Sequence, residues 1–201
     1  MSEVEPVGHP RDGKSAGVAA RPRVNVHTRM EMNAAVASWL LCAAEDRKTA
    51  RQGWERDGLA LIRCGSLFSA VRIPGEFIRA AAGVDLKGGW EEAPRVDAFL
   101  ASALEDGPVI ADWYAGQYYA LVPASEGRHW YGRGTAFLGA ASYLGVPRPD
   151  VDEPGLARSY WSVPMESPGA LCCPDALQAF ALNAKALAGA RRRELEADRE
   201  R

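Results

Sequence analysis

The sequence has few of the residues that build metal centres or redox pairs, and no segment that would span a membrane. Its 201 residues include four cysteines and three histidines, and these form neither a C-x-x-C pair nor a spaced Cys/His framework for zinc. No apolar run approaches the roughly 20 residues of a membrane span. Residues 1–23 lack the apolar segment of a signal peptide. We therefore expect a cytoplasmic protein, not inserted in a membrane, whose cysteines are small hydrophobic residues.

An excess of charge of one sign is also missing. Lysine and arginine number 24 against 26 aspartates and glutamates, which gives a formal net charge of −2. A basic field over the whole surface is excluded, so any contact with nucleic acid has to be local. Hydrophobic residues at 47% and charged residues at 25% are ordinary for a globular protein. At this length one folded domain is expected.

Common catalytic motifs are absent as well. The chain has no G-x-S-x-G, and no serine or cysteine has a nearby histidine that could be argued to act as its base. There is no phosphate-binding G-x-x-x-x-G-K-[ST]. The spacing of Asp150 and Asp152 can hold a divalent cation through oxygen ligands. These residues also lie in a proline-rich loop, where a solvated aspartate is common.

The apolar pattern divides the chain into three parts. Residues 1–28 are rich in Gly, Pro, Ala and Arg without apolar periodicity, which predicts a disordered leader. Residues 29–188 mix helix and strand patterns without regular alternation. This predicts a single α+β domain with a mixed or antiparallel sheet and flanking helices. Residues 189–201 alternate in charge and predict a helical or frayed tail.

Local patterns predict the elements of this domain. Apolar residues at helical spacing predict helices over 30–51, 75–83, 94–107 and 174–187. Short runs of β-branched, aromatic and apolar residues predict strands over 59–65, 67–74, 108–114, 117–123, 135–147 and 158–164. Ala115 and Gly116 separate two of these strands and favour a tight hairpin.

Aromatic residues are dense around the glycine-rich hairpins. On a sheet they could stack on bases while nearby arginines contact phosphates. They are equally good strand residues that half-bury in a core. His129 is the histidine expected in the folded body. The aromatic residues of this region are Trp113, Tyr114, Tyr118, Tyr119, Trp130, Tyr131, Tyr143, Tyr160 and Trp161.

Five segments between residues 58 and 164 follow one another in a distinctive order. They are CGSLFSAVRIP at 64–74, DGPVIA at 106–111, YYALVP at 118–123, FLG through YLGVPRP at 137–149, and YWSVP at 160–164. In this order the chain resembles the N-terminal domain of bifunctional DNA primase/polymerases, in the actinobacterial branch of the archaeo-eukaryotic primase superfamily. The resemblance covers about half the chain and implies a primase/polymerase-like fold with a role related to DNA replication.

The chain departs from this family at the positions that matter for catalysis. The resemblance implies two acidic metal ligands on a strand near 71–74, where this chain has Arg72 and no carboxylate. It implies a nucleotide-contacting histidine near Gln117 or Tyr118, and a third acidic residue near 137–139; both are absent. Two-metal transfer needs carboxylates to hold Mg²⁺ against phosphates. The resemblance therefore implies that polymerase chemistry has been lost.

Three hypotheses about function follow. The first is a catalytically inactive primase/polymerase-like domain with an accessory or regulatory role, no cofactor, and weak binding of a nucleotide or single-stranded nucleic acid. The second is a protein-interaction module whose aromatic residues form a partner surface. The third is an active nucleotidyltransferase that holds Mg²⁺ through Asp150 and Asp152. For the first, the candidate contacts are Arg72, Tyr118, Arg128, His129, Trp130, Arg133 and Arg148.

Overall fold

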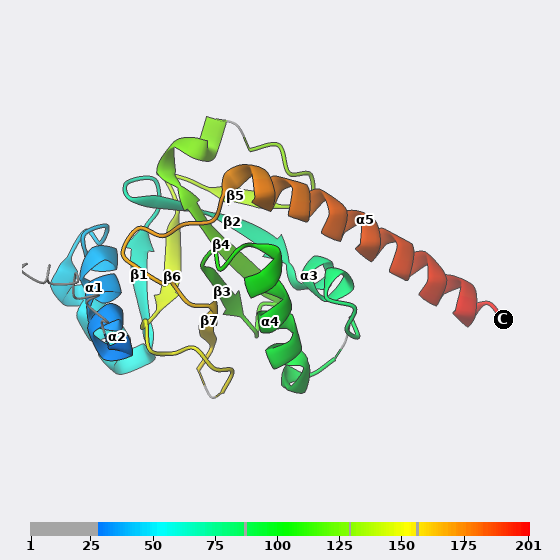
Figure 1. Cartoon of the computed structure of the whole chain (residues 1–201), viewed down its shortest axis with the longest axis horizontal. Helices are drawn as coiled ribbons and strands as arrows, with labels where there is room; N and C mark the ends of the chain where they lie inside the picture. Colours follow the sequence, from blue (N-terminus) through cyan, green and yellow to red (C-terminus); the bar gives the residue numbers. More distant parts are fainter. Residues whose placement is uncertain (1–27, 87, 129, 156) are drawn as a thin grey trace, which may run out of the picture.

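An antiparallel sheet of five strands lies at the centre of the protein (Figure 1). The computed structural model describes residues 28–86, 88–128, 130–155 and 157–201. Helices flank the sheet, and a second sheet of two strands lies beside it (Figure 1). The α+β class expected from the sequence is confirmed, and the sheets are antiparallel throughout.

The large sheet has the strand order β5-β2-β4-β3-β7, and the small sheet pairs β1 with β6. Strand β2 lies between β5 and β4, so that Arg72 stands opposite both Ala136 and Tyr119. The two strands of the small sheet come from segments that are far apart in the sequence. The strand bounds are β1 Leu59–Arg63, β2 Phe68–Pro74, β3 Val109–Asp112, β4 Gln117–Pro123, β5 Ala136–Leu138, β6 Tyr143–Pro147 and β7 Ser159–Val163.

Five α-helices and two short 3₁₀ helices occur among the described residues. The last helix runs without interruption to Arg199, and its C-terminal part extends away from the body (Figure 1). The helix bounds are α1 Arg29–Leu41, α2 Arg47–Asp57, α3 Gly75–Ala81, η1 Trp90–Glu92, α4 Ala93–Ala103, η2 Ala124–Arg128 and α5 Pro174–Arg199.

The single helix predicted for residues 30–51 is wrong, because two helices form there. Asp46 adopts an extended backbone conformation and caps the second helix. Its carboxylate accepts hydrogen bonds from the Lys48 amide at 2.8 Å and the Thr49 hydroxyl at 2.6 Å. Aspartate satisfies the free amides at a helix start better than it continues a helix. The cap therefore divides one apolar pattern into two helices.

The hairpin between β3 and β4 also differs from the prediction, because β3 ends two residues earlier than expected, at Asp112. The Asp112 carboxylate accepts a hydrogen bond from the Ala115 amide at 3.0 Å, a turn typical of aspartate. Gly116 then takes a positive φ of 60°. Trp113 and Tyr114 consequently leave the sheet and become part of the turn.

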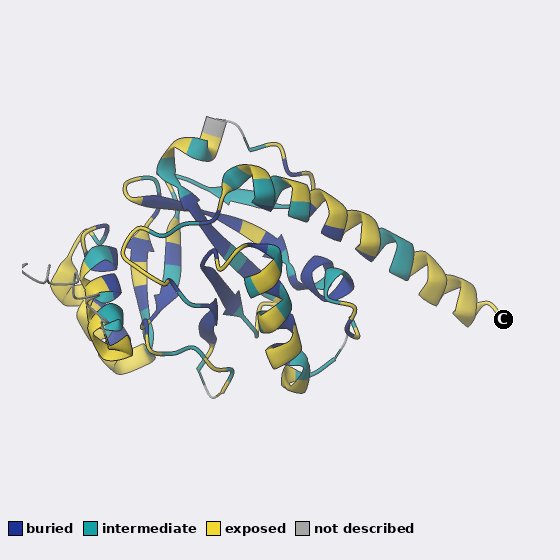
Figure 2. Ribbon diagram, in the orientation of Figure 1, coloured by how far each residue is buried: buried dark blue, intermediate teal, exposed yellow. Residues whose placement is uncertain are grey.

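Buried residues form two cores, one on each face of the large sheet. Side chains alternate between the faces of a strand, so Val71 and Ile73 pack in the core with residues of α3, α4 and α5. Phe68 and Ala70 pack in the other core with residues of α1, α2 and the small sheet. Figure 2 shows the central strands buried and the outer sides of the helices exposed. Among the described residues, no helix has the length and hydropathy of a membrane span.

Candidate functional site

A polar cleft lies where the small sheet meets the face of the large sheet that carries Arg72. We call it the inter-sheet cleft. Its volume is about 390 Å³, within the range of small-molecule sites. Both sheets contribute to its walls, which consist of Leu59, Leu61, Arg72, Asp112, Tyr119, Leu138, Tyr143, Leu144, Gly145, Arg158 and Ser159.

Two arginines lower the pKa of the same tyrosine in this cleft. Arg72 of β2 stands directly opposite Tyr119 of β4, and Arg158 immediately precedes β7. Partial burial raises the pKa of the Tyr119 hydroxyl, and the charge of Asp112 raises it further, whereas Arg72 and Arg158 both lower it. Both guanidinium groups are therefore close enough to the Tyr119 hydroxyl to influence its charge.

The charges of the cleft do not cancel. Asp112 is its lining carboxylate, and its side chain is 14% exposed at 3.6 Å from Arg158. Arg72 is exposed, and no described residue forms an ion pair with its guanidinium. One carboxylate thus faces two guanidiniums, which leaves a local excess of positive charge.

Two residues of the cleft lie on the segments at which the resemblance to primase/polymerases implies acidic metal ligands. Arg72 lies on β2, and Leu138 lies on β5 within the segment where a third acidic residue was expected. Tyr119 lies beside the position expected for a histidine. Among the described residues, no three or more His, Cys, Asp or Glu side chains come together in a way that could hold a metal ion. The cleft is therefore suited to an anion rather than to a metal cation.

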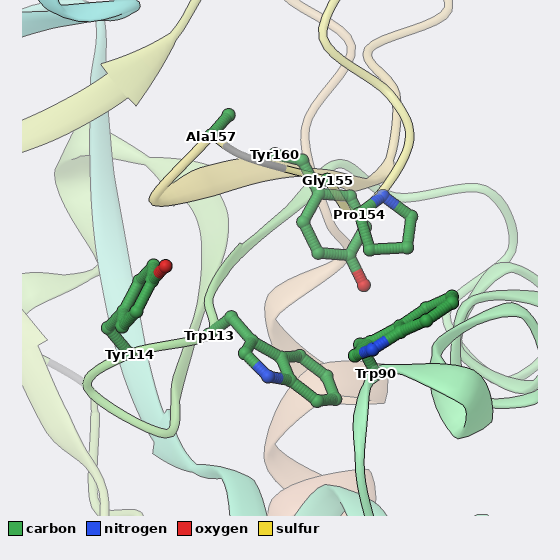
Figure 3. Close-up of a pocket in the computed structure, with 7 residues that line it drawn as sticks. All are labelled: Trp90, Trp113, Tyr114, Pro154, Gly155, Ala157 and Tyr160. Atoms are coloured by element: carbon green, nitrogen blue, oxygen red, sulfur yellow. The ribbon is translucent and has the colours of Figure 1, made fainter.

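A second hollow of about 500 Å³ adjoins the other core of the protein. We call it the aromatic pocket. The hydroxyl of Tyr160 points into the space between Trp90 and Trp113 (Figure 3). The turn that ends β3 early places Trp113 and Tyr114 here, and η1 supplies Trp90. The lining residues are Trp90, Trp113, Tyr114, Pro154, Gly155, Ala157 and Tyr160.

A partly buried carboxylate, Asp97 of α4, lies behind the aromatic pocket. It accepts hydrogen bonds from the hydroxyl of Tyr160 at 3.1 Å and from the hydroxyl of Ser162. Burial raises the pKa of Asp97 to about 6, although both hydroxyls favour its charged form. Among the described residues, no lysine or arginine forms an ion pair with it. The hydrogen bonds to its carboxylate thus come from two hydroxyl groups.

A buried arginine, Arg79, lies beside Trp113 of the aromatic pocket. The Arg79 guanidinium lies 4.8 Å from the ring centre of Trp113 and donates to the carbonyl oxygen of Asp85 at 3.2 Å. Tyr118 is buried nearby, and burial raises its pKa to about 12. Its hydroxyl has no hydrogen-bond partner in the part of the chain that the structure describes. Tyr118, a sequence candidate for nucleotide contact, therefore belongs to the core, while its neighbour Tyr119 faces the cleft.

Two of the loop candidates, Trp130 and Arg133, lie outside both hollows. Trp130 is half-buried and donates its indole N–H to the hydroxyl of Thr135 at 3.0 Å. Arg133 is exposed and lines neither hollow. Arg128 ends η2, and His129 lies outside the described residues.

The acidic-loop candidates pair with arginines instead of facing one another across a metal site. Arg148 donates to the carboxylate of Asp150, and Arg29 donates to that of Asp152. All four are surface or partly exposed side chains. Among the predicted nucleotide contacts whose side chains the structure describes, Arg72 is the one that lines the inter-sheet cleft.

Sequence reasoning missed Arg158, Asp97 and Trp90 as site residues. A signal for Asp97 was present, since it occupies a helical position between the buried residues Ala93 and Leu100. A carboxylate on an apolar helix face needs a partner or a function. Arg158 had no such signal, because its cleft exists only once β7 lies beside β3.

Comparisons with known proteins do not place the chain in a family. No protein-family model matches it, no curated protein matches it, and no solved structure matches it. Functional inference therefore depends on its own residues and their geometry.

Proposed function

We propose that the inter-sheet cleft binds the phosphates of a nucleotide or of single-stranded nucleic acid. In this proposal the chain is a primase/polymerase-like domain without polymerase activity that serves an accessory or regulatory role. The observation that carries it is the cleft itself, in which Arg72 and Arg158 share one wall with Tyr119 and face a single carboxylate.

The chemistry of the cleft suits a phosphate. A guanidinium offers a planar fork of N–H donors that matches two phosphate oxygens. Arg72 has this fork free of ion pairs with described residues, and Arg158 shares its own only with Asp112 at 3.6 Å. The rings of Tyr119 and Tyr143 line the same space, and aromatic rings stack on bases of any sequence.

The same residues argue against nucleotidyl transfer. A two-metal mechanism needs carboxylates that bridge Mg²⁺ ions to the substrate phosphates. In the cleft, Asp112 already interacts with Arg158 and with the Ala115 amide, and Arg72 would repel a metal cation. Binding without transfer is the function this arrangement supports best.

The proposal is tested by titrating the protein with a nucleoside triphosphate and with a short single-stranded DNA, at low and at high salt. We expect Arg72→Ala to weaken binding of both about tenfold or more, since a hydrogen bond to a charged group is worth about 1.5–3 kcal/mol. Binding should also fall steeply with salt. Arg133→Ala is the matched control, because Arg133 is exposed and does not line the cleft.

Failure to bind either ligand at low salt would contradict the proposal. It would favour the alternative in which exposed apolar residues such as Leu61 and Tyr143 form a protein-interaction surface. A separate assay with primer, nucleotides and Mg²⁺ or Mn²⁺ tests the loss of catalysis, and we expect no extension. Extension that disappears in Asp150→Ala would support the active-enzyme hypothesis.

A further inference from the structure

The aromatic pocket combines electron-rich rings with a carboxylate that forms no ion pair among the described residues. Trp90 forms an exposed wall, with 67% of its surface accessible, whereas Tyr160 is 1% exposed and forms the floor. The carboxylate of Asp97 lies one hydrogen bond behind this floor. Neither feature is used by the inter-sheet cleft.

The hydrogen bond between Tyr160 and Asp97 gives the floor of the pocket a definite polarity. Since the Tyr160 hydroxyl donates its proton to Asp97, its oxygen keeps lone pairs for the pocket side. That oxygen points toward the space between Trp90 and Trp113 (Figure 3). Ring faces carry negative electrostatic potential as well. Walls and floor therefore favour positive charge.

We propose that the aromatic pocket binds a small organic cation, a methylated ammonium group, held by the rings of Trp90, Trp113 and Tyr160 and by the charge of Asp97. A cage of aromatic rings is an effective site for such a group, because its charge is diffuse and cheap to desolvate. The site is separate from the cleft, so this proposal does not depend on phosphate binding.

The alternatives fit the pocket less well. An anion would meet the ring faces and the carboxylate together, which repel it. A neutral planar ring could stack on Trp90, but it would leave the buried charge of Asp97 without a counter-ion, and burying a charge without a partner is costly. The Arg79 guanidinium already lies 4.8 Å from the ring centre of Trp113, so the charge of Asp97 decides whether the pocket accepts a second cation. Arg79 forms no ion pair with Asp97 among the described residues, so the charge of Asp97 stays available.

The test is calorimetric titration of the full chain with choline and with 3,3-dimethyl-1-butanol, its neutral isostere. At pH 8 Asp97 is ionised, because its pKa is about 6. We expect choline to bind about tenfold or more tightly than the isostere, because its charge interacts both with the rings and with the Asp97 carboxylate. Equal affinity for the two probes, or no binding of choline, would overturn the proposal.

Two variants separate the contributions of charge and ring. Asp97→Asn keeps the shape of the side chain and should weaken choline binding about tenfold, while Asp57→Asn, the same change at an exposed ion pair, should leave it unchanged. Trp90→Ala alters an exposed residue and should also weaken binding without affecting folding. Choline affinity that survives both variants would contradict the assignment, and a nucleotide titration of the same samples reports separately on the cleft.

Discussion

The inter-sheet cleft and the aromatic pocket lie against opposite faces of one sheet, and the charged groups beside them are of opposite sign. In the cleft, two arginines face one carboxylate near the surface. In the pocket, a carboxylate with a raised pKa sits behind aromatic rings and is met by two hydroxyls. The first arrangement favours an anionic ligand and the second a cationic one.

This contrast follows from strand geometry. Neighbouring residues of β4 point to opposite faces, so Tyr118 enters the core under the helices while Tyr119 enters the cleft. On β7, Tyr160 lines the aromatic pocket, whereas its neighbour Ser159 lines the cleft. A shift of one residue in register would exchange the residues of the two sites.

The largest effect we expect is on the free energy of unfolding, because the folded protein holds the Asp97 carboxylate in a partly buried position. Its pKa rises from 3.8 to about 6 on folding, so between these values the folded protein keeps a proton that the unfolded chain releases. The free energy of unfolding should therefore fall by about 2–3 kcal/mol as the pH rises from 4 to 7. Urea unfolding at several pH values measures this fall.

The Asp97→Asn variant isolates this contribution. It cannot ionise, so its stability relative to the wild type should increase as the pH rises from 4 to 7. Asp57→Asn is the control, since the pKa of Asp57 is lowered by its hydrogen bond with Arg56 and the sign of its pH dependence is opposite. A difference between wild type and Asp97→Asn that is constant with pH would show that Asp97 is not buried as described.

Removing the second cation of the cleft should have a smaller effect. Arg158 is 63% exposed and already interacts with Asp112, so Arg158→Ala should weaken nucleotide binding about threefold to tenfold, or about 1 kcal/mol. Isothermal titration at low salt measures the change. A loss as large as that of Arg72→Ala would mean that the two arginines contribute equally, and no change would remove Arg158 from the site.

Neutralising the carboxylate of the cleft should have the reverse effect. Asp112→Asn keeps the oxygen that accepts the Ala115 amide and releases Arg158, so nucleotide binding should tighten about twofold to fivefold. The same titration detects it. Weaker binding with an unchanged melting temperature would indicate that Asp112 contacts the ligand itself.

The smallest effect we expect is on the free energy of unfolding when Trp90, the exposed wall of the aromatic pocket, is replaced. Because Trp90 is 67% exposed, Trp90→Ala should change the free energy of unfolding by no more than about 0.5 kcal/mol. Urea unfolding at pH 8 tests this. A loss of several kcal/mol would show that Trp90 is part of the core rather than the wall of a binding site.

Local sequence patterns predicted most elements, because β-branched and aromatic runs such as 117–123 and apolar helical spacing are local properties. The helix start at Asp46 was missed inside a run of charged residues, where its capping role competes with the helical pattern. The pairing of β1 with β6 joins residues such as Leu59 and Pro147, a contact that no local pattern encodes.

The candidate site was predicted only in part, for the same reason. Arg72 was found because its strand carries the resemblance to primase/polymerases, but its neighbours Arg158 and Leu138 come from distant strands. Tyr118 was chosen in place of Tyr119, since alternation alone does not say which face of β4 is covered by helices. Burial, which decides this, depends on tertiary packing.

The most direct test of the account is a crossed titration of two ligands against two variants. A nucleoside triphosphate and choline are each titrated into the wild type, Arg72→Ala and Asp97→Asn at pH 8 and low salt. We expect Arg72→Ala to lose nucleotide affinity alone and Asp97→Asn to lose choline affinity alone, about tenfold in each case. Nucleotide affinity that is unchanged in Arg72→Ala, or two variants that weaken both ligands equally, would contradict it.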